Sequence, residues 1–376
     1  MTAIKKVLVI GGGIGGLSAA IALSRQGVSV DLVELRTSWI PYPVGIILGS
    51  NTLRAMKQLG VIDAAIENGF PYLGMSICDK DGNVLSHLQN RALAGPEYPS
   101  NLGMTRPALH DVLSAAAKAA GTSVRLGTSA DALVNHEDHV AVTFSDGSKG
   151  DYDLVVGADG VYSKTRSLLF GEQYRPEYTG QGAWRYNVPR PEGLDRSYIY
   201  DGVAGGKAGV VPLTKDTMYI YLVRKEDGNP YFPPDQLATL FRDRLSEYGG
   251  LIGEVRDRDI TDSKSVVYRP LEALLVPAPW YQGRILLIGD AVHATTPHLG
   301  QGAAQAIEDA VVLAEEVGNG GPVAALLQRF MERRFERCRF IVESSLQIGE
   351  WEQRPVPGAD HAGIVKEMHR VTALPI

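Results

Sequence analysis

The chain has 376 residues, of which 44% are hydrophobic and 21% charged, which is typical of a globular protein large enough for two cores. Its net charge of −6 gives no basic excess for binding nucleic acid, and no apolar run reaches the roughly 18 residues of a membrane-spanning helix. Cys78 and Cys338 form no CxxC motif and no metal-ligand spacing. We therefore expect a cytoplasmic protein without metal, nucleic-acid or membrane binding.

The first 34 residues predict a strand, a glycine-rich turn, a helix and a second strand. Residues 7–10 form an apolar strand, an Ala-rich helix runs to about Gln26, and residues 28–34 form the next strand. The turn GGGIGG at 11–16 contains the pattern GxGxxG after a strand and before a helix, the context that this pattern requires.

Each glycine of the pattern has a physical role. Gly11 allows the tight turn, Gly13 lets backbone amides approach a pyrophosphate, and Gly16 lets the helix lie close to the sheet. Glu34, at the end of the second strand, is placed to accept hydrogen bonds from a ribose. The ligand predicted from these residues is FAD or NAD.

The middle of the chain predicts β structure of two kinds. Short β segments near Val124, Ala132 and Val140, followed by an apolar strand at 154–156, indicate an antiparallel sheet laid on a parallel core. Residues 179–267 contain runs with aromatic residues at every second place, which indicates a second sheet with one buried face and a substrate site.

The last third returns to the parallel core. Residues 284–289 read as a buried strand, and the following helix has an apolar stripe of Ala303, Ile307, Ala310, Val311 and Ala314. A further helix extends from Val323 to about Gly349, and the sequence then breaks it with Pro355, Pro357 and Gly358.

A second motif lies in DYDLVVGADGVYSKTR at 151–166. An apolar strand ends there in Ala158-Asp159-Gly160, and Ser163 and Arg166 follow at the spacing of a turn into a helix. Taken alone, Asp159 and Ser163 are equally well explained as helix caps.

Together, three sets of residues resemble the fingerprints of the class A flavoprotein aromatic hydroxylases, which include para-hydroxybenzoate and salicylate hydroxylases. The first set is Gly11, Gly13 and Gly16 with Glu34. The second is Asp153, Ala158, Asp159, Gly160, Ser163 and Arg166. The third is Gly289, Asp290, Pro297, Gly300, Gln301 and Gly302.

The resemblance implies that one FAD joins the two distant glycine turns, with adenosine at the first and flavin at the second. It implies that Asp290 meets the ribityl chain, that the Asp159-Gly160 region serves FAD and the reduced nicotinamide, and that Arg106 begins a helix near the FAD phosphates. Arg106 also reads as a surface arginine. The full set expected to contact FAD is Gly11, Gly13, Ile14, Gly15, Gly16, Glu34, Arg36, Gly45, Arg106, Asp159, Asp290, Pro297, Gly300, Gly302 and Ala303.

Two stretches depart from the family pattern. Many relatives have Gly-Ala-Gly-Ile in the loop beside the flavin, where this chain has Pro43-Val44-Gly45-Ile46, and many have Asn where it has Ala304. The first difference changes the residues of the loop that lies beside the flavin in those relatives, and the second removes one polar partner.

The resemblance also implies an α/β fold with a discontinuous Rossmann-like FAD-binding domain (parallel sheet plus antiparallel layer), a mixed-sheet substrate domain and C-terminal helices. We expect the FAD-binding domain at 1–72, 102–178 and 266–320, and the substrate domain at 73–101 and 179–265. Residues 321–376 form the C-terminal helical segment.

The reaction that the resemblance implies begins with reduction of FAD by NAD(P)H. O₂ then adds to give a flavin C4a-hydroperoxide, which hydroxylates a phenol, hydroxybenzoate or hydroxypyridine-type ring. Pro297 matches the proline whose carbonyl lies by the flavin, so His298 is expected to project toward the ring and orient or deprotonate it. The alternative is that His298 only caps the turn.

On the substrate sheet, the strand TMYIYLV resembles strands that line the pocket, so Tyr219 is expected to point inward and bind substrate. Tyr221 shares its face and either binds substrate or fills that face. Arg185 either binds a substrate carboxylate or supports the FAD side, and Ile47 is expected to line the substrate pocket.

Three other functions are open. A flavin-dependent halogenase shares the first turn, but its WxWxIP motif is WRYNVP here, without the second tryptophan, at 184–189. A geranylgeranyl-reductase-like flavoprotein shares the first and last fingerprints, and a non-catalytic flavin-binding regulator would bind FAD without substrate-stimulated oxidation. We expect a monomer or homodimer, with Arg333, Arg334 and Arg339 on a solvated helix face or at a subunit contact.

Overall fold

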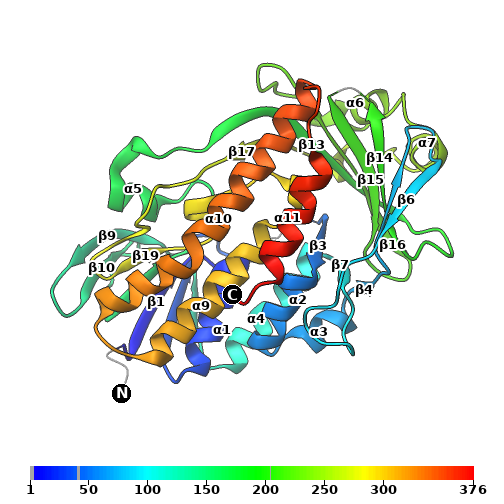
Figure 1. Ribbon diagram of the computed structural model, residues 1–376. Coiled ribbons are helices and arrows are strands. Elements are labelled where there is room, and N and C mark those ends of the chain that lie inside the picture. The colour runs from blue at the N-terminus through cyan, green and yellow to red at the C-terminus, as the bar shows by residue number, and fades with distance from the viewer. Residues whose placement is uncertain (1–3, 40–42, 204) are drawn as a thin grey trace.

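The computed structural model describes residues 4–39, 43–203 and 205–376. They form two sheet-based units, and a long C-terminal helix extends from one to the other (Figure 1). The first unit is built on a six-stranded sheet of order β18-β19-β12-β1-β2-β8. All of its neighbouring pairs are parallel except β18 with β19. Its strands are β1 (Lys6–Ile10), β2 (Ser29–Glu34), β8 (Ser123–Leu126), β12 (Leu154–Gly157), β18 (Tyr281–Gln282) and β19 (Ile285–Leu287).

The central strands of this sheet are apolar because both faces are covered. One face packs on α1 (Ile14–Arg25), α4 (Arg106–Ala119) and α9 (Gly302–Asn319). The other face packs on a three-stranded antiparallel sheet. Leu8 and Ile10 of β1 share a buried cluster with Val140 and Phe144 of that sheet. That layer consists of β9 (Ala130–Asn135), β10 (Val140–Phe144) and β11 (Lys149–Tyr152).

The predicted antiparallel layer is therefore present, with one correction. The β segment near Val124 is β8, and it pairs in parallel with β2 at the edge of the six-stranded sheet. A four-residue strand carries too little pattern to show which sheet it joins.

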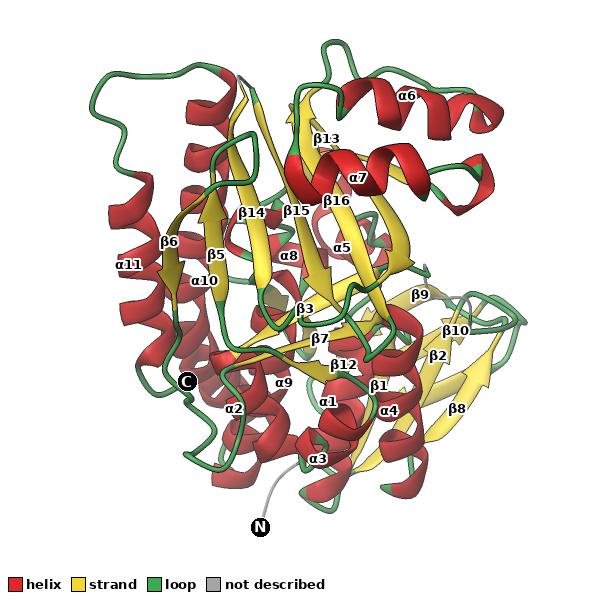
Figure 2. Ribbon diagram, turned by 90° about the vertical axis from the view of Figure 1, so that its right-hand side faces the viewer, coloured by secondary structure: helices red, strands yellow, loops and turns green. Residues whose placement is uncertain are grey.

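The second unit is a seven-stranded sheet of order β17-β13-β16-β15-β14-β5-β6. Its strands are β5 (Met75–Cys78), β6 (Val84–Leu88), β13 (Glu177–Pro189), β14 (Ser197–Val203), β15 (Gly206–Pro212), β16 (Thr217–Lys225) and β17 (Val267–Ala273). Helices α6 (Leu237–Arg244) and α7 (Gly250–Arg258) cover its outer face (Figure 2). Trp184, Met218 and Ile220 point toward these helices, so alternation turns their neighbours toward the first unit. The predicted boundary at 266 places β17 with the FAD-binding segments, yet β17 pairs with β13.

A small sheet of β3 (Gly45–Gly49), β4 (Phe70–Pro71) and β7 (Asn101–Thr105) lies at the junction of the two units (Figure 2). A Cβ on Gly103 of β7 would lie 1.9 Å from the carbonyl oxygen of Pro212 in β15. Only glycine allows this approach of two backbones, so the small sheet contacts the inner face of the large one.

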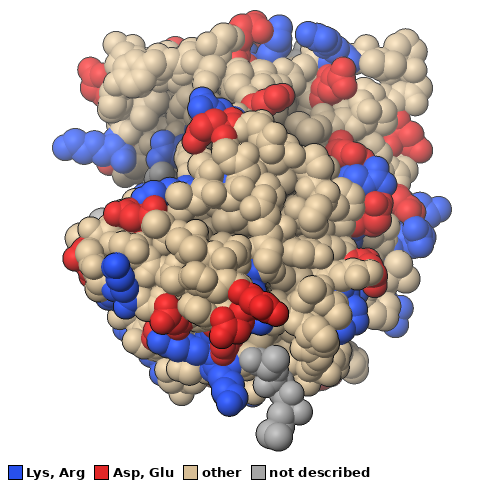
Figure 3. All heavy atoms as spheres, turned by 90° about the vertical axis from the view of Figure 1, so that its left-hand side faces the viewer, with Lys and Arg blue, Asp and Glu red and all other residues tan. Residues whose placement is uncertain are grey.

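The C-terminal segment is mainly α10 (Val323–Gln353), against which α11 (His361–Ala373) packs. The other helices are α2 (Ser50–Leu59), α3 (Ile62–Glu67), α5 (Lys164–Phe170) and α8 (Asp290–His293). Short 3₁₀ turns are η1 (Gly171–Gln173), η2 (Pro234–Gln236), η3 (Ser263–Ser265) and η4 (Pro297–Leu299). Of the helices described, none combines the length and apolar character needed to cross a bilayer. On the face shown in Figure 3, basic and acidic side chains alternate without a field of one sign.

Candidate active site

The first glycine turn packs tightly at two positions and is open at a third. A Cβ on Gly11 would lie 2.5 Å from the Ala158 carbonyl oxygen, and one on Gly16 would lie 1.9 Å from the Gly11 carbonyl oxygen. The backbone of Gly11 is also in a region that favours glycine, with φ of 106°. By contrast, a Cβ on Gly13 would meet nothing within 4 Å. The turn thus joins helix to sheet closely and leaves an open backbone surface for an anion.

The Glu34 carboxylate is fixed beside this turn. Its Oε2 accepts a hydrogen bond from the Gly12 amide at 2.8 Å, and its Oε1 accepts one from the Arg36 amide at 2.9 Å. Glu34, the predicted acceptor for a ribose, is therefore held in place by two backbone amides. Each carboxylate oxygen has capacity for a further donor.

Trp39 and His110 complete this end of the site, and neither was predicted from the sequence. The Trp39 ring lies against Gly12, where a Cβ would come within 2.3 Å of it, and its centroid is 4.6 Å from that of His110. His110 Nε2 is 3.1 Å from the Gly12 carbonyl oxygen. The sequence did contain one indication of this contact. Gly12 is not required by the GxGxxG pattern, but the Trp39 ring leaves no room for a side chain there.

The second motif is used mainly within its own turn. Asp159 Oδ2 accepts hydrogen bonds from the Thr165 amide and hydroxyl, both at 2.9 Å, and Ser163 caps α5 by accepting from the Arg166 amide at 2.9 Å. Arg166 is buried and donates to three backbone carbonyls. The side chains of Asp159 and Ser163 therefore act as caps at the start of α5, which is the alternative that the sequence left open. The part open to a ligand is Gly160, whose added Cβ would meet nothing within 4 Å.

The second glycine turn lies beside the first. Strand β19 pairs with β12, which pairs with β1, so both turns lie at the carboxyl edge of one parallel sheet, with β12 between the strands that precede them. Helices α1 and α9 pack together, and a Cβ on Gly15 would be 3.4 Å from that of Ala306. Gly300 has φ of 64° and an open Cβ position. Parallel sheets bind ligands at this edge, so one elongated dinucleotide can reach both turns.

Asp290, at the start of α8, and Arg106, at the start of α4, are close enough for their charges to interact. The Asp290 side chain is accessible to solvent yet surrounded by protein, as expected in a deep groove. Burial raises the pKa of Asp290, and the positive charges of His293 and Arg106 oppose that rise. Arg106 is therefore half-buried near Asp290 and is not an isolated surface residue.

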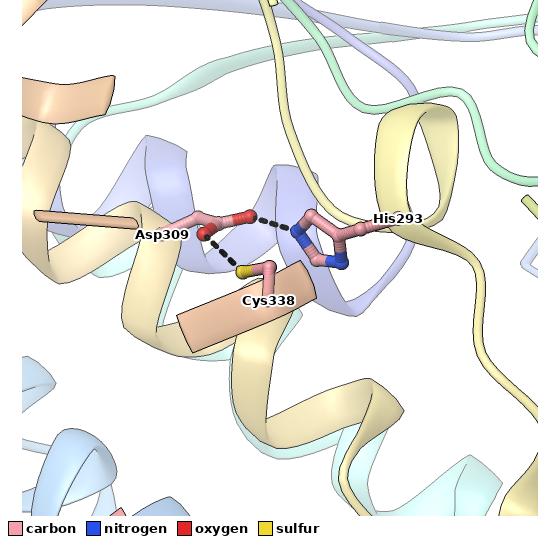
Figure 4. Close-up of side chains that lie close together, drawn as sticks. All are labelled: His293, Asp309 and Cys338. Atoms are coloured by element: carbon pink, nitrogen blue, oxygen red, sulfur yellow. Dashed lines mark hydrogen bonds and ion pairs between the residues drawn. The ribbon is translucent and has the colours of Figure 1, made fainter. Parts of the chain in front are cut away.

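Behind the second turn is a buried charged network (Figure 4). Asp309 Oδ2 accepts hydrogen bonds from His293 Nε2 at 2.7 Å and from the Gly289 amide at 2.9 Å. Its Oδ1 accepts from Arg334 Nε at 2.8 Å, and Cys338 Sγ lies 3.9 Å from the same oxygen. His293, Asp309 and Cys338 are close enough to hold a metal ion. However, the guanidinium already balances the carboxylate charge, so this network supports the turn.

Gln301 of the third fingerprint also has a supporting role. Its amide exchanges hydrogen bonds with that of Asn51 in α2, at 2.9 and 3.2 Å, and its side chain is buried. Pro297 begins η4, and its carbonyl oxygen accepts a hydrogen bond from the Gly300 amide at 3.0 Å. Both contacts fix the shape of the predicted flavin turn.

His298 is placed differently from the prediction. Its side chain is 0% exposed, Nδ1 lies 2.8 Å from Thr296 Oγ1, and Nε2 lies 3.1 Å from Glu352 Oε2 in α10. Both ring nitrogens are thus used by protein partners, which corrects the expectation that His298 projects toward the substrate ring. The position of His298 after Pro297 correctly predicted the turn in which it lies. The direction of its side chain depends on the packing of α10, which supplies Glu352.

Glu352 joins this turn to the substrate sheet. Its Oε1 accepts a hydrogen bond from Lys207 of β15 at 2.7 Å, and its Oε2 accepts from Gln181 of β13 at 3.1 Å. Burial alone would raise the pKa of Glu352, but Lys207 and His298 lower it to about 2. Because a carboxylate only accepts, the neutral His298 carries its proton on Nε2. Glu352 and Lys207 were not predicted, since no spacing links them to the motifs.

The inner face of the large sheet brings the predicted substrate residues together. Arg185 of β13 lies opposite Tyr221 of β16, and Tyr219 is on the same face. The Tyr219 and Tyr221 ring centroids are 5.8 Å apart. Ile47 of β3 and Tyr221 both pack against the apolar cluster that contains Tyr219, and a Cβ on Gly45 would lie 2.3 Å from the Tyr219 ring. The altered loop at 43–46 thus contacts the predicted substrate pocket.

These three polar groups are all donors at neutral pH. Burial raises the pKa of Tyr219, although Arg185 and Arg106 oppose the rise, and burial raises the pKa of Tyr221 well above its usual value. Burial lowers the pKa of Arg185 to about 10, and Arg106 adds to that effect. The phenols therefore keep their protons and the guanidinium keeps its charge.

Known proteins share this architecture over nearly the whole chain. The family model described as "FAD binding domain" matches residues 5–345. A putative FAD-dependent monooxygenase of Bacillus subtilis, YetM, is 32% identical over 358 residues, covering 95% of this chain and 96% of that protein. The 2-heptyl-3-hydroxy-4(1H)-quinolone synthase of Pseudomonas aeruginosa is 34% identical over 356 residues, covering 92% of this chain and 90% of its own. The structure of Klebsiella pneumoniae HpxO with FAD and uric acid superposes with a TM-score of 0.84 at 24% identity, covering 98% and 92% of the two chains.

The chain therefore belongs to the FAD binding domain family and, within it, to the class A flavoprotein aromatic hydroxylases. This confirms the predicted family, fold class and FAD cofactor. The open Gly13 surface, the fixed Glu34 carboxylate and the Asp290 groove are the features of this chain that fit FAD.

Proposed function

We propose that this protein uses NAD(P)H and O₂ to hydroxylate a small electron-rich aromatic or N-heteroaromatic ring. The observation that carries the proposal is that Glu352 joins the inner face of the large sheet, through Lys207, to the second glycine turn, through His298. Tyr219 on that face is close enough to Arg106 for the guanidinium to oppose the rise in the pKa of the phenol, and Arg106 acts in the same way on the pKa of Asp290. A ring held between them would lie at the flavin end of the site.

The chain would then supply binding, orientation and exclusion of water. Tyr219 and Tyr221 donate hydrogen bonds to an oxygen or ring nitrogen, while Ile47 provides an apolar wall. FAD, when bound, accepts electrons from the nicotinamide and activates oxygen. We assign its phosphates to the Gly13 turn and Arg106, its ribose to Glu34, and its flavin end to Asp290 and the turn from Pro297 to Gly302. Contacts at Gly160 would use the backbone.

Relatives support a heteroaromatic or phenolic substrate. Proteins at 29% identity include an FAD-dependent urate hydroxylase of Klebsiella oxytoca and a 6-methylsalicylate 1-monooxygenase of Aspergillus terreus. Cys78 and Cys338, both free and buried, support the proposed reducing, cytoplasmic location.

The test uses purified holoenzyme with a panel of hydroxybenzoates, hydroxypyridines, quinolones and purines. NADH and NADPH oxidation is followed in parallel with product mass, and protein stripped of FAD is the control. We expect at least one ring to stimulate oxidation and gain one oxygen atom. FAD-loaded protein that oxidises neither nicotinamide with any ring would instead favour a flavin-binding regulator.

A further inference from the structure

We propose that β6 is an interface between two copies of this protein, which pair antiparallel along the free edge of the large sheet about a two-fold axis at Ser86. This contact goes beyond the proposed hydroxylase function and does not depend on it. Strands β15, β14 and β5 separate β6 from β16, which carries Tyr219, so β6 and β16 are roughly 19 Å apart.

The open edge of the sheet is the first argument. Strand β6 is the last strand of the sheet, and within the described residues it pairs only with β5 (Figure 2). All five residues of β6, Val84–Leu88, are exposed. The backbone amides and carbonyls that point away from β5 are therefore available to a further strand.

The apolar side chains at this edge are the second argument. Leu85 is 65% exposed, Val84 47% and Leu88 43%. Leu73, which is 51% exposed, lies beside the end of β6, because a Cβ on the neighbouring Gly74 would be 2.2 Å from the Leu88 carbonyl oxygen. Apolar side chains that gather on one exposed surface indicate a contact with another molecule.

The edge also lacks the charges that usually keep an edge strand single. Proteins protect such strands with lysine, other charged side chains or proline. Residues 82–90 contain no Asp, Glu, Lys, Arg or Pro. One protective feature is present, a shift of register at Ile77 and Cys78 of β5, but it lies at the start of β6 and leaves Ser86 to Leu88 in regular pairing.

The charges at the two ends of β6 favour an identical partner. The turn before the strand contains Asp79, Lys80 and Asp81, two acids and one base, for a net charge of −1. Arg91 follows the strand, is exposed, and has no ion-pair partner among the described residues. Antiparallel pairing brings the acidic turn of each copy toward Arg91 of the other, so this attraction forms twice, whereas parallel pairing would bring like charges together.

The same pairing matches the side chains along the strand. With Ser86 on the axis, Val84 lies opposite Leu88 of the second copy, and Leu85 lies opposite His87 of the second copy. Each β6 then occupies the free edge of the other. The contact therefore closes at two copies and does not extend into a longer stack.

Sedimentation of the FAD-loaded protein from about 1 to 200 µM tests this contact, and we expect a reversible monomer–dimer equilibrium, since so short an edge buries less surface than a standard interface. Ser86→Lys places two ammonium groups beside each other on the axis and should raise the dimer dissociation constant at least about tenfold. Val134→Lys is the matched control, because Val134 is 51% exposed on β9, which is also an edge strand. It should keep the wild-type dissociation constant, and both variants should keep the wild-type FAD content.

Ser86→Cys tests the position of the axis. Opposite residues of an antiparallel pair have Cα atoms about 4.5–5.5 Å apart, which is within disulfide range, so mild oxidation should give a covalent dimer. Val134→Cys should give none, and the native Cys78 and Cys338 are buried. Wild type that stays monomeric up to about 200 µM overturns the inference. A dimer that Ser86→Lys leaves intact, or assembly that continues beyond two copies, overturns it as well.

Discussion

The glycine turn allows cofactor binding to be separated from folding by single methyl groups. Gly13 has φ of −77° and ψ of −171°, which alanine adopts without strain, and an added Cβ meets nothing within 4 Å. Gly13→Ala should therefore change the free energy of unfolding of the apoprotein by less than about 1 kcal/mol. The methyl group would nevertheless stand on the surface assigned to the pyrophosphate. Loss of one charge-assisted hydrogen bond, about 1.5–3 kcal/mol, should weaken FAD binding about 10- to 100-fold.

Gly16→Ala should have the reverse effect. Its Cβ would lie 1.9 Å from the Gly11 carbonyl oxygen, so the helix or the turn must move, at a cost of about 1–3 kcal/mol. Urea unfolding of FAD-stripped protein measures stability, and flavin fluorescence titration measures affinity. Gly49→Ala is the control, because Gly49 also precedes a helix with extended backbone, and its added Cβ would make only an ordinary contact with Asn51 Oδ1 at 3.8 Å. FAD affinity of Gly13→Ala within about threefold of wild type would refute the phosphate assignment.

Glu352→Gln should leave Lys207 without its partner and lower the free energy of unfolding by about 2 kcal/mol, less than for a fully buried pair because both groups keep some exposure. Denaturant unfolding checks this, and an unchanged midpoint would contradict a stabilising role for the Glu352–Lys207 ion pair. Tyr219→Phe should weaken substrate binding severalfold without changing FAD content, whereas equal substrate dissociation constants would assign the phenol to packing. Arg334→Met should destabilise the protein by about 3–5 kcal/mol, since it leaves buried carboxylates unpaired, and thermal unfolding of the purified variant measures it. The pKa of Asp309 is lowered from 3.8 to about 2, so its charge stabilises the fold above pH 4 by about 2 kcal/mol, and this contribution is lost as pH falls toward 2. The free energy of unfolding should fall as the pH is lowered from 4 to 2. A free energy of unfolding that does not change over this range would contradict the stabilising role of the Asp309 charge.

Much of the fold could be predicted from the sequence where the signal is local. Strand β1, the following turn and α1 match their predicted positions within a few residues, as do β12, β19, α9 and the start of α10. The β segment at β8 was predicted, but it was assigned to the wrong sheet because its pairing partner β2 lies far along the chain. Helix α11 lies in the predicted C-terminal helical segment, but its bounds after the proline and glycine break were not predicted.

In the candidate site, too, the residues with a local sequence signal were predicted, and those placed by contacts between distant segments were not. Gly11 and Gly16 were identified correctly as positions that need glycine, because a close backbone approach excludes a Cβ there, whereas the role of Gly13 toward a pyrophosphate stays a prediction. His298 was assigned to the right turn but to the wrong environment. Trp39 was missed, since its contact with Gly12 follows from no periodicity.

The sequence by itself determined the backbone of the two glycine turns and the class of cofactor, because those properties depend on short stretches and on the absence of side chains. Tertiary structure alone decided which charges are matched. Glu352 reaches Lys207 from 145 residues away, and Arg185 meets no carboxylate at all within the described chain. The physical reason is that a charge is neutralised by proximity in space, which the folding of α10 across the large sheet creates and which no local pattern records.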